Sequence, residues 1–153
     1  MLPFKKILCP TDFSEASYEA LKAANELARH FSSELLLVHV ITPIPFVTSA
    51  PRMPTAFNVP EYQQEVLTMS QRSLEDVIRE KVPKEVKARA EVGIGTAADQ
   101  IVAIADKEAV DLIAISTHGQ TGWRRFLFGS VAEKVVRLAS QAVLVVQAPR
   151  GEG

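Results

Sequence analysis

The sequence has little cysteine, little net charge and no long apolar run, and each shortage excludes a class of protein. The single cysteine, Cys9, cannot form a disulfide within the chain, and in the apolar run 7–9 it reads as a small hydrophobic residue. Seventeen basic and 18 acidic residues give a net charge of −1, which leaves no broad basic surface for nucleic acid. No apolar run is long enough to span a membrane, and Pro10 and Asp12 interrupt the first one too early for a signal peptide. We therefore expect a cytoplasmic protein with neither a nucleic-acid nor a membrane partner.

Length and hydrophobic periodicity indicate one domain of alternating strands and helices. The 153 residues are 47% hydrophobic, which is enough for the chain to bury a core of its own. Apolar runs typical of strands lie at 4–9, 35–41, 86–92, 110–116 and 142–147, and helical spacing of apolar residues lies at 16–31, 61–82, 97–105 and from 130 onward. Strands separated by helices are typical of parallel sheets covered on both faces. We predict an α/β fold, a single-domain three-layer sandwich with a five-stranded parallel sheet and four helices.

The predicted domain spans residues 1–148, contains one irregular excursion and precedes a flexible tail at 149–153. Five of the nine prolines lie at 43–60, and their spacing excludes a regular helix or a central strand, so we expect a long surface excursion there. The run 86–92 alternates apolar with charged residues, which indicates an edge strand. The run 142–147 is also expected at an edge, where it invites pairing with a second copy of the chain.

Asp12 is the first candidate for chemistry, because it follows the first predicted strand. Ligands of open parallel sheets bind outside the carboxyl ends of the strands. A carboxylate there can accept hydrogen bonds from a ribose or hold a metal bound to phosphate. It can equally assist Ser14 in capping the helix that follows. The residues alone leave both roles open.

The segment 116–130 is the second candidate, since it leads from a strand end through a glycine-bearing loop into a helix. Small residues at Ser116 and Gly119 allow backbone N–H groups to approach an anion. Gly129 and Ser130 stand at a helix N-terminus, whose dipole favours phosphate. Glycines that serve only turns are the alternative. The segment therefore has both halves of a phosphate-binding site.

The same segment resembles the nucleotide-binding signature of the universal stress protein family, written G-x2-G-x9-G-[ST]. Gly119 takes the second glycine of that signature, and Gly129 and Ser130 take the final pair. Ser116 stands where the family has its first glycine. The runs 5–14, 37–40 and 143–146 are similar to the first, second and last strands of the family, so the resemblance covers the whole chain.

The resemblance implies a Rossmann-like fold of the adenine nucleotide alpha hydrolase type and a stress-response sensor or regulator that binds ATP, or ADP or AMP, with Mg²⁺ or Mn²⁺. It places Asp12 near the ribose or the metal, Val40 beside the adenine, and Gly119, Gly129 and Ser130 at the phosphates. It further implies a homodimer formed through 142–147. The implied nucleotide-binding residues are Pro10, Thr11, Asp12, Val40, Ser116, His118, Gly119, Gly129, Ser130 and Val131.

Two alternative functions remain. Ser116 and the proline-rich excursion suit an interaction module of the same fold that has lost nucleotide binding. His118 suits a weak ATPase, because a histidine beside a bound phosphate is a common general acid or base. No second carboxylate and no Ser-His-Asp set accompanies His118, so we expect at most slow hydrolysis and assign no catalytic residue.

Three further patterns suggest less. The run 93–98 has the form G-x-G-x-x-A, but the next strand ends without the acidic residue that grips a dinucleotide ribose, so we expect a turn that lines the adenine side of the site. His39 lies in an aliphatic strand and is expected to bond within the core. The aromatic and basic run 123–128 suits a lid, an oligomer contact or a loop anchor, and we favour Phe126 and Phe128 as anchors.

Overall fold

The computed structural model of the chain describes residues 1–43, 58–118 and 129–149. Most of the predicted excursion at 43–60, Gly119 and the aromatic run 123–128 therefore lie outside the described residues. The described elements are β1 (Lys6–Pro10), α1 (Glu15–Phe31), β2 (Glu34–Ile41), α2 (Val59–Lys81), β3 (Ala88–Ile94), α3 (Ala97–Lys107), β4 (Leu112–Ser116), α4 (Ser130–Leu138) and β5 (Ala142–Val146).

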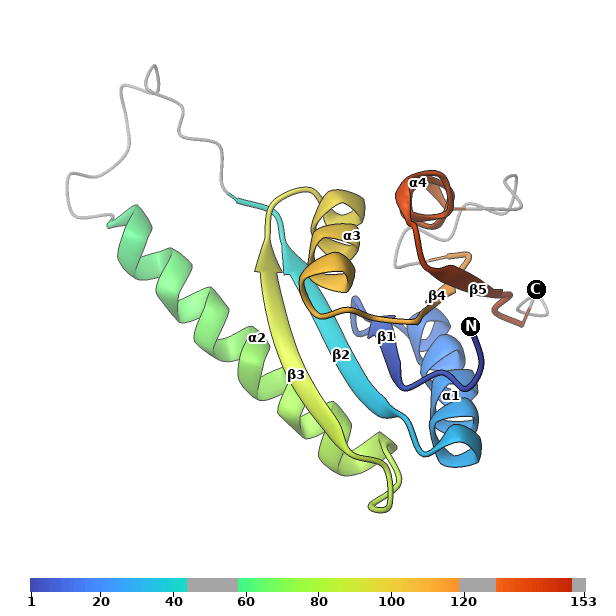
Figure 1. The fold of residues 1–153 in the computed structure, drawn as a ribbon. Helices are drawn as coiled ribbons and strands as arrows, with labels where there is room; N and C mark the ends of the chain where they lie inside the picture. The colour runs from blue at the N-terminus through green and yellow to red at the C-terminus, as the bar shows by residue number, and fades with distance from the viewer. Residues whose placement is uncertain (44–57, 119–128, 150–153) are drawn as a thin grey trace.

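The strands form one parallel sheet in the order β3-β2-β1-β4-β5, which confirms the predicted α/β architecture (Figure 1). The chain begins in the centre at β1, moves outward to β3, and then crosses to the other side for β4 and β5. Strands β3 and β5 are the two edges, as their sequences predict. The direction in which successive strands are added to the sheet reverses between β1 and β4. These two strands are neighbours in the sheet, although β2 and β3 lie between them in the sequence.

The two-residue period of the central strands divides the core into two layers. Ile7, Cys9 and Leu37 pack with residues of α1 and α2, whereas Leu8 and Val38 pack with residues of α3 and α4. All five side chains are completely buried, because helices cover both faces of β1 and β2. Burial raises the pKa of the Cys9 thiol to about 12, so this cysteine is protonated and acts as a hydrophobic residue, as expected.

The helix α2 begins two residues earlier than its apolar spacing predicts. Pro60 lies in the first turn of the helix, where its missing N–H removes no hydrogen bond. Asn58 caps this turn, since its side-chain oxygen accepts a hydrogen bond from the Glu61 N–H at 3.3 Å. Within the described residues, no helix is both long and apolar enough for a transmembrane segment.

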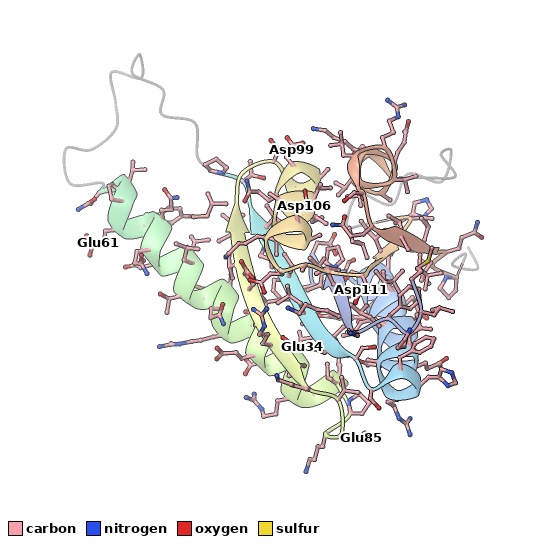
Figure 2. The ribbon with its side chains drawn as sticks, in the orientation of Figure 1. Glu34, Glu61, Glu85, Asp99, Asp106 and Asp111 are labelled. Atoms are coloured by element: carbon pink, nitrogen blue, oxygen red, sulfur yellow. The ribbon has the colours of Figure 1, made fainter. Side chains whose placement is uncertain are left out.

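An ion-pair network joins the amino-terminal ends of the strands to the end of α3. Arg89 on β3 pairs with Glu34 on β2 at 2.7 Å and also with Glu108, which follows α3. Lys6 on β1 donates to the Glu108 carbonyl at 2.9 Å. Asp111 accepts hydrogen bonds from the backbone N–H groups of Lys5 and Lys6, and it lies with Glu34 among the side chains drawn in Figure 2. The network holds three strands and one helix end in register.

The network makes a pH-dependent contribution to stability. The Arg89 guanidinium is the main reason that the pKa values of Glu34 and Glu108 lie below the usual range. Groups with a lowered folded pKa stabilise the fold above their ordinary pKa, about 4.3 for glutamate, and lose that effect as the pH falls through the lowered pKa. We expect Arg89→Met to lower the urea midpoint at pH 7 and to approach the parent's midpoint only at an acid pH below the lowered pKa values of Glu34 and Glu108.

The matched control is Arg79→Met, which removes an exposed pair with Asp76 three residues away on α2. This control is expected to unfold at the parent's midpoint at both pH values. Urea unfolding followed by circular dichroism makes the comparison. If Arg89→Met loses the same stability at both pH values, its effect comes from packing and the electrostatic account is wrong.

Candidate functional site

A cavity of about 340 Å³ lies at the carboxyl ends of β1, β2 and β4, where the strand order reverses. Its walls come from the β1–α1 loop, the last residues of β2 and β4, and the first turns of α3 and α4. Helices α3 and α4 lie on the same face of the sheet (Figure 1), and a 3.1 Å ion pair between Asp99 and Lys134 joins them. The carboxyl ends of parallel strands at such a reversal are the usual ligand site of this architecture.

The β1–α1 loop is held in place by its own small polar side chains. The Thr11 N–H donates to the Val38 carbonyl at 2.8 Å, and the Thr11 hydroxyl shares a hydrogen bond of 2.8 Å with Ser17. The Phe13 N–H donates to the same Thr11 hydroxyl at 3.0 Å. Phe13 has a φ of 65°, a left-handed conformation that residues other than glycine seldom adopt. These hydrogen bonds hold Phe13 in that conformation. Hydrogen bonds within the chain therefore hold the loop in one conformation.

Asp12 lines the cavity and takes part in capping α1. Its Oδ1 atom accepts hydrogen bonds from the Ser14 N–H at 3.0 Å and from the Ser14 hydroxyl. The Ser14 hydroxyl oxygen in turn accepts from the Ser17 N–H at 3.2 Å. The capping role that the sequence left open is thus present in the structure. It fixes the direction of a carboxylate in the cavity wall.

His39 lies in the cavity wall rather than in the core. Its Nδ1 atom is 2.8 Å from the Thr11 carbonyl oxygen, and its ring lies against Phe13 with centroids 4.6 Å apart. Since the carbonyl can only accept, the Nδ1 atom carries the proton. The predicted internal hydrogen bond exists, but the predicted position in the core is wrong, because His39 is half-buried and lines the cavity near the end of β2.

The end of β4 is fixed by four hydrogen bonds. The Ser116 hydroxyl donates to the His118 carbonyl at 2.9 Å, and the Thr117 hydroxyl lies 2.8 Å from His118 Nδ1. The Thr117 N–H donates to the Val146 carbonyl of β5 at 3.0 Å, and the Thr117 carbonyl accepts from the Gly129 N–H at 2.5 Å. Residues 116–118 are therefore tied to β5 and to the start of α4.

The N-terminus of α4 faces the cavity through Ser130, Val131 and Ala132. Gly129 occupies the capping position, and no side chain there accepts from the first turn. A β-carbon on Gly129 would overlap the Thr117 carbonyl oxygen, so the glycine is required by close backbone approach and not by its φ of −65°. The positive end of the helix dipole therefore lies at the cavity wall, where an anion is favoured.

All the residues predicted to bind a ligand share this one cavity where the structure describes them, and Gly119 lies outside the described residues. Those in the cavity are Pro10, Thr11, Asp12, Val40, Ser116, His118, Gly129, Ser130 and Val131. That they bind a ligand remains a prediction. Sequence reasoning did not identify Ser17, His39 and Thr117, or the apolar wall formed by Val38, Ile101 and Ile115. Their positions in the sequence were a usable signal. Ser17 lies one helical turn after Ser14, Ile115 directly precedes Ser116, and Val38 lies two residues before Val40.

The run 93–98, predicted to line the site, contributes Ala97 to the cavity wall, next to Ile101 of α3, whereas Gly93 and Gly95 do not line the cavity. Gly95 has a φ of +144° and donates its N–H to the Ile41 carbonyl at 2.9 Å, so the turn role remains. In the described part of the chain, no group of three His, Cys, Asp or Glu side chains is placed to hold a metal ion.

Comparisons with known proteins agree on one family. The sequence model of the universal stress protein family matches residues 3–147. The chain is 36% identical to the universal stress protein MJ0531 of Methanocaldococcus jannaschii, over 97% of this chain and 85% of that protein. It is 31% identical to the universal stress protein MJ0577 of the same organism, over 94% and 95% of the two chains.

Solved structures show the same fold. The structure of MJ0577 superposes with a TM-score of 0.80 at 30% identity, over 97% of this chain and 99% of that one. A universal stress protein in complex with cAMP has a TM-score of 0.67 at 20% identity, covering 95% and 98% of the chains. A universal stress protein from Archaeoglobus fulgidus in complex with dAMP has a TM-score of 0.54 at 21% identity, covering 95% and 98%. The last two likenesses concern the fold alone.

The close contact at Gly129 generates a stability prediction. We expect Gly129→Ala to lower the free energy of unfolding by about 1–3 kcal/mol, because the added methyl group forces the start of α4 away from the Thr117 carbonyl. Ser130→Ala, one residue later and exposed, is the control and is expected to stay within about 0.5 kcal/mol of the parent. Urea unfolding measures both. Equal stability of Gly129→Ala and the parent would show that the backbone contact is not needed.

Proposed function

The chain belongs to the universal stress protein family, and on this premise we propose that it binds an adenine nucleotide, ATP in the first instance, in the cavity at the ends of β1, β2 and β4. In this proposal it acts as a sensor or regulator in a stress response, with at most slow hydrolysis. The observation that carries the proposal is the composition of the cavity, in which an apolar wall and an open helix N-terminus face the same space.

The two ends of the cavity suit the two ends of a nucleotide. Val38, Val40 and Ile101 form an apolar wall against which an adenine ring can pack, and the backbone of Val40 at the end of β2 can bond its edge. The uncapped first turn of α4 suits the phosphates. Asp12 lies on the loop between these parts, where a carboxylate can accept from a ribose hydroxyl. The cAMP and dAMP found in two structures of this fold are adenine nucleotides as well, which supports the ligand class.

A divalent cation, Mg²⁺ or Mn²⁺, enters this proposal together with the nucleotide. No set of three ligating side chains exists among the described residues, so the phosphates would supply most of its ligands. Asp12 is the carboxylate of the cavity wall that could join them. The cation neutralises phosphate charge, and the chain's own residues orient the nucleotide.

Rapid hydrolysis is not part of the proposal. Among the described residues of the cavity wall, the titratable side chains are Asp12, His39 and His118. Two of them are engaged in fixing the loops, because Asp12 caps α1 and His39 donates to Thr11. His118 bonds Thr117 through its Nδ1 atom. A weak ATPase that uses His118 remains the enzymatic alternative, and it predicts that His118→Ala abolishes turnover while ATP affinity stays nearly the same.

A charge placed at the first turn of α4 tests the phosphate site. Val131 lines the cavity, and 38% of its surface is exposed. The helix dipole stabilises a glutamate in the first turn of a helix, so this substitution should not destabilise the fold. We expect Val131→Glu to fold normally and to weaken ATP binding by about tenfold or more, because its charge repels the phosphates. Val136→Glu is the matched control, since Val136 is 47% exposed on the same helix and does not line the cavity.

Isothermal titration with ATP and Mg²⁺ compares the parent and the two variants, and chromatography of denatured protein detects nucleotide that co-purifies. If Val131→Glu and the parent bind ATP with equal affinity, the first turn of α4 does not bind the phosphates. If the parent shows no heat and releases no nucleotide, the proposal fails and the interaction module without nucleotide is favoured.

We also propose that the chain forms a homodimer through residues 142–147. Strand β5 is an edge of the sheet, and Leu144 on it is 36% exposed. An apolar edge strand pairs readily with a copy of itself. We expect Leu144→Glu to convert the dimer to a monomer in analytical ultracentrifugation, because it places a charge in the contact, whereas Met69→Glu on the exposed side of α2 leaves the dimer intact. A parent protein that sediments as a monomer, or a Leu144→Glu dimer, would contradict the proposal.

A further inference from the structure

Ser116 departs from the family signature at a position that faces the cavity. The signature has glycine there, and the chain has a residue with a hydroxyl group at the last position of β4. The side chain is half-buried, and its hydroxyl donates to the His118 carbonyl at 2.9 Å. The serine therefore forms a hydrogen bond at the end of β4 that a glycine could not form.

This hydrogen bond decides what Ser116 can offer to a ligand. A hydroxyl has one proton to donate and lone pairs that accept. Because the proton is used by the His118 carbonyl, the Ser116 oxygen presents only its accepting side to the cavity. A phosphate group is itself an acceptor and gains nothing from such a partner, whereas a sugar hydroxyl can donate to it.

The position of Ser116 in the sheet corresponds to the sugar of the proposed nucleotide. Strand β1 lies between β2 and β4, so the loop that carries Asp12 lies between the end of β2 and Ser116. The adenine is assigned to the β2 side, at Val40, and the phosphates to the start of α4. The sugar, which joins the two, then lies over the ends of β1 and β4, where Asp12 and Ser116 line the same cavity.

The Ser116 oxygen is also held still. The next residue, Thr117, is bonded through its N–H to Val146 on β5 and through its carbonyl to Gly129 at 2.5 Å. The acceptor of the Ser116 proton, the His118 carbonyl, lies in the same tied segment. An acceptor that needs no reordering on binding loses less entropy than a mobile one, which makes it suitable for discriminating between ligands.

We propose that Ser116 is a specificity-determining residue that accepts a hydrogen bond from one ribose hydroxyl and so disfavours nucleotides that lack that hydroxyl. The inference rests on the proposed nucleotide binding. In this proposal Ser116, at the first position of the signature, contacts the sugar and does not contact the phosphates.

The test compares the affinities for ATP, 2′-deoxyATP and 3′-deoxyATP by isothermal titration in the presence of Mg²⁺. We expect the parent to bind ATP about 3–10-fold more tightly than the analogue that lacks the contacted hydroxyl, the ratio that one neutral hydrogen bond supplies. Ser116→Ala is expected to bind ATP more weakly by that factor and to bind that analogue as the parent does, so the ratio falls to about one. Ser116→Thr keeps the hydroxyl and is expected to keep the ratio.

Two comparisons separate this contact from a structural effect. Ser140→Ala removes an exposed serine outside the cavity and is expected to change no affinity. Ser116→Gly restores the family signature and is expected to behave as Ser116→Ala does. Equal ribose-to-deoxyribose ratios in the parent and Ser116→Ala, or tighter ATP binding by Ser116→Gly than by the parent, would overturn the inference.

The outcomes also separate this inference from the proposed function. If the parent binds ATP and both deoxy analogues with equal affinity, the proposed nucleotide binding stands and the proposed role of Ser116 is wrong. If the parent binds none of the three, both proposals are wrong. Circular dichroism of each variant confirms that the fold is present, and the ratio measured on the parent tests the inference even where a variant does not fold.

Discussion

The site depends on one constraint, which is that two neighbouring parallel strands send the chain to opposite faces of the sheet. Strand β1 leads to α1 on the face covered by α1 and α2, and β4 precedes α4 on the face covered by α3 and α4. Because both strands end at the same edge, the starts of α1 and α4 are separated there on opposite faces of the sheet. The cavity lies at this separation, and its residues come from distant parts of the sequence. The ion-pair network at the opposite end of the sheet keeps the strands in the register that the cavity requires.

The fold could be predicted from the sequence because hydrophobic spacing determines which segments are buried and on how many faces. Leu35, Leu36 and Leu37 are fully buried as consecutive residues, which is possible only in a strand covered on both sides, and the run 86–92 alternates because β3 is an edge. The start of α2 was less predictable. Pro60 ends regular structure in most contexts, and only its position in a first helical turn makes it compatible with the helix.

The candidate site could be predicted only in part, since its polar residues depend on tertiary contacts. Asp12 and Gly129 were identified because each stands at a strand or helix boundary with a recognisable pattern. His39 was assigned to the core because its neighbours in sequence are aliphatic, and the carbonyl of Thr11 that turns its ring toward the cavity is 28 residues away. The conformation of Phe13 was not foreseeable either. The first 92 residues contain no glycine, so the left-handed positions among the described residues of that part, 1–43 and 58–92, fall to Phe13 and Ser32.

The burial of Cys9 has a consequence for chemical durability. The thiolate is the form of cysteine that oxidants and alkylating agents attack, and at neutral pH a thiol with a pKa of about 12 supplies almost none of it. Cys9 is the only cysteine, and its side chain has no exposed surface. The folded protein therefore offers electrophiles no accessible sulfhydryl group. The central strand β1 therefore escapes thiol oxidation as long as the chain stays folded.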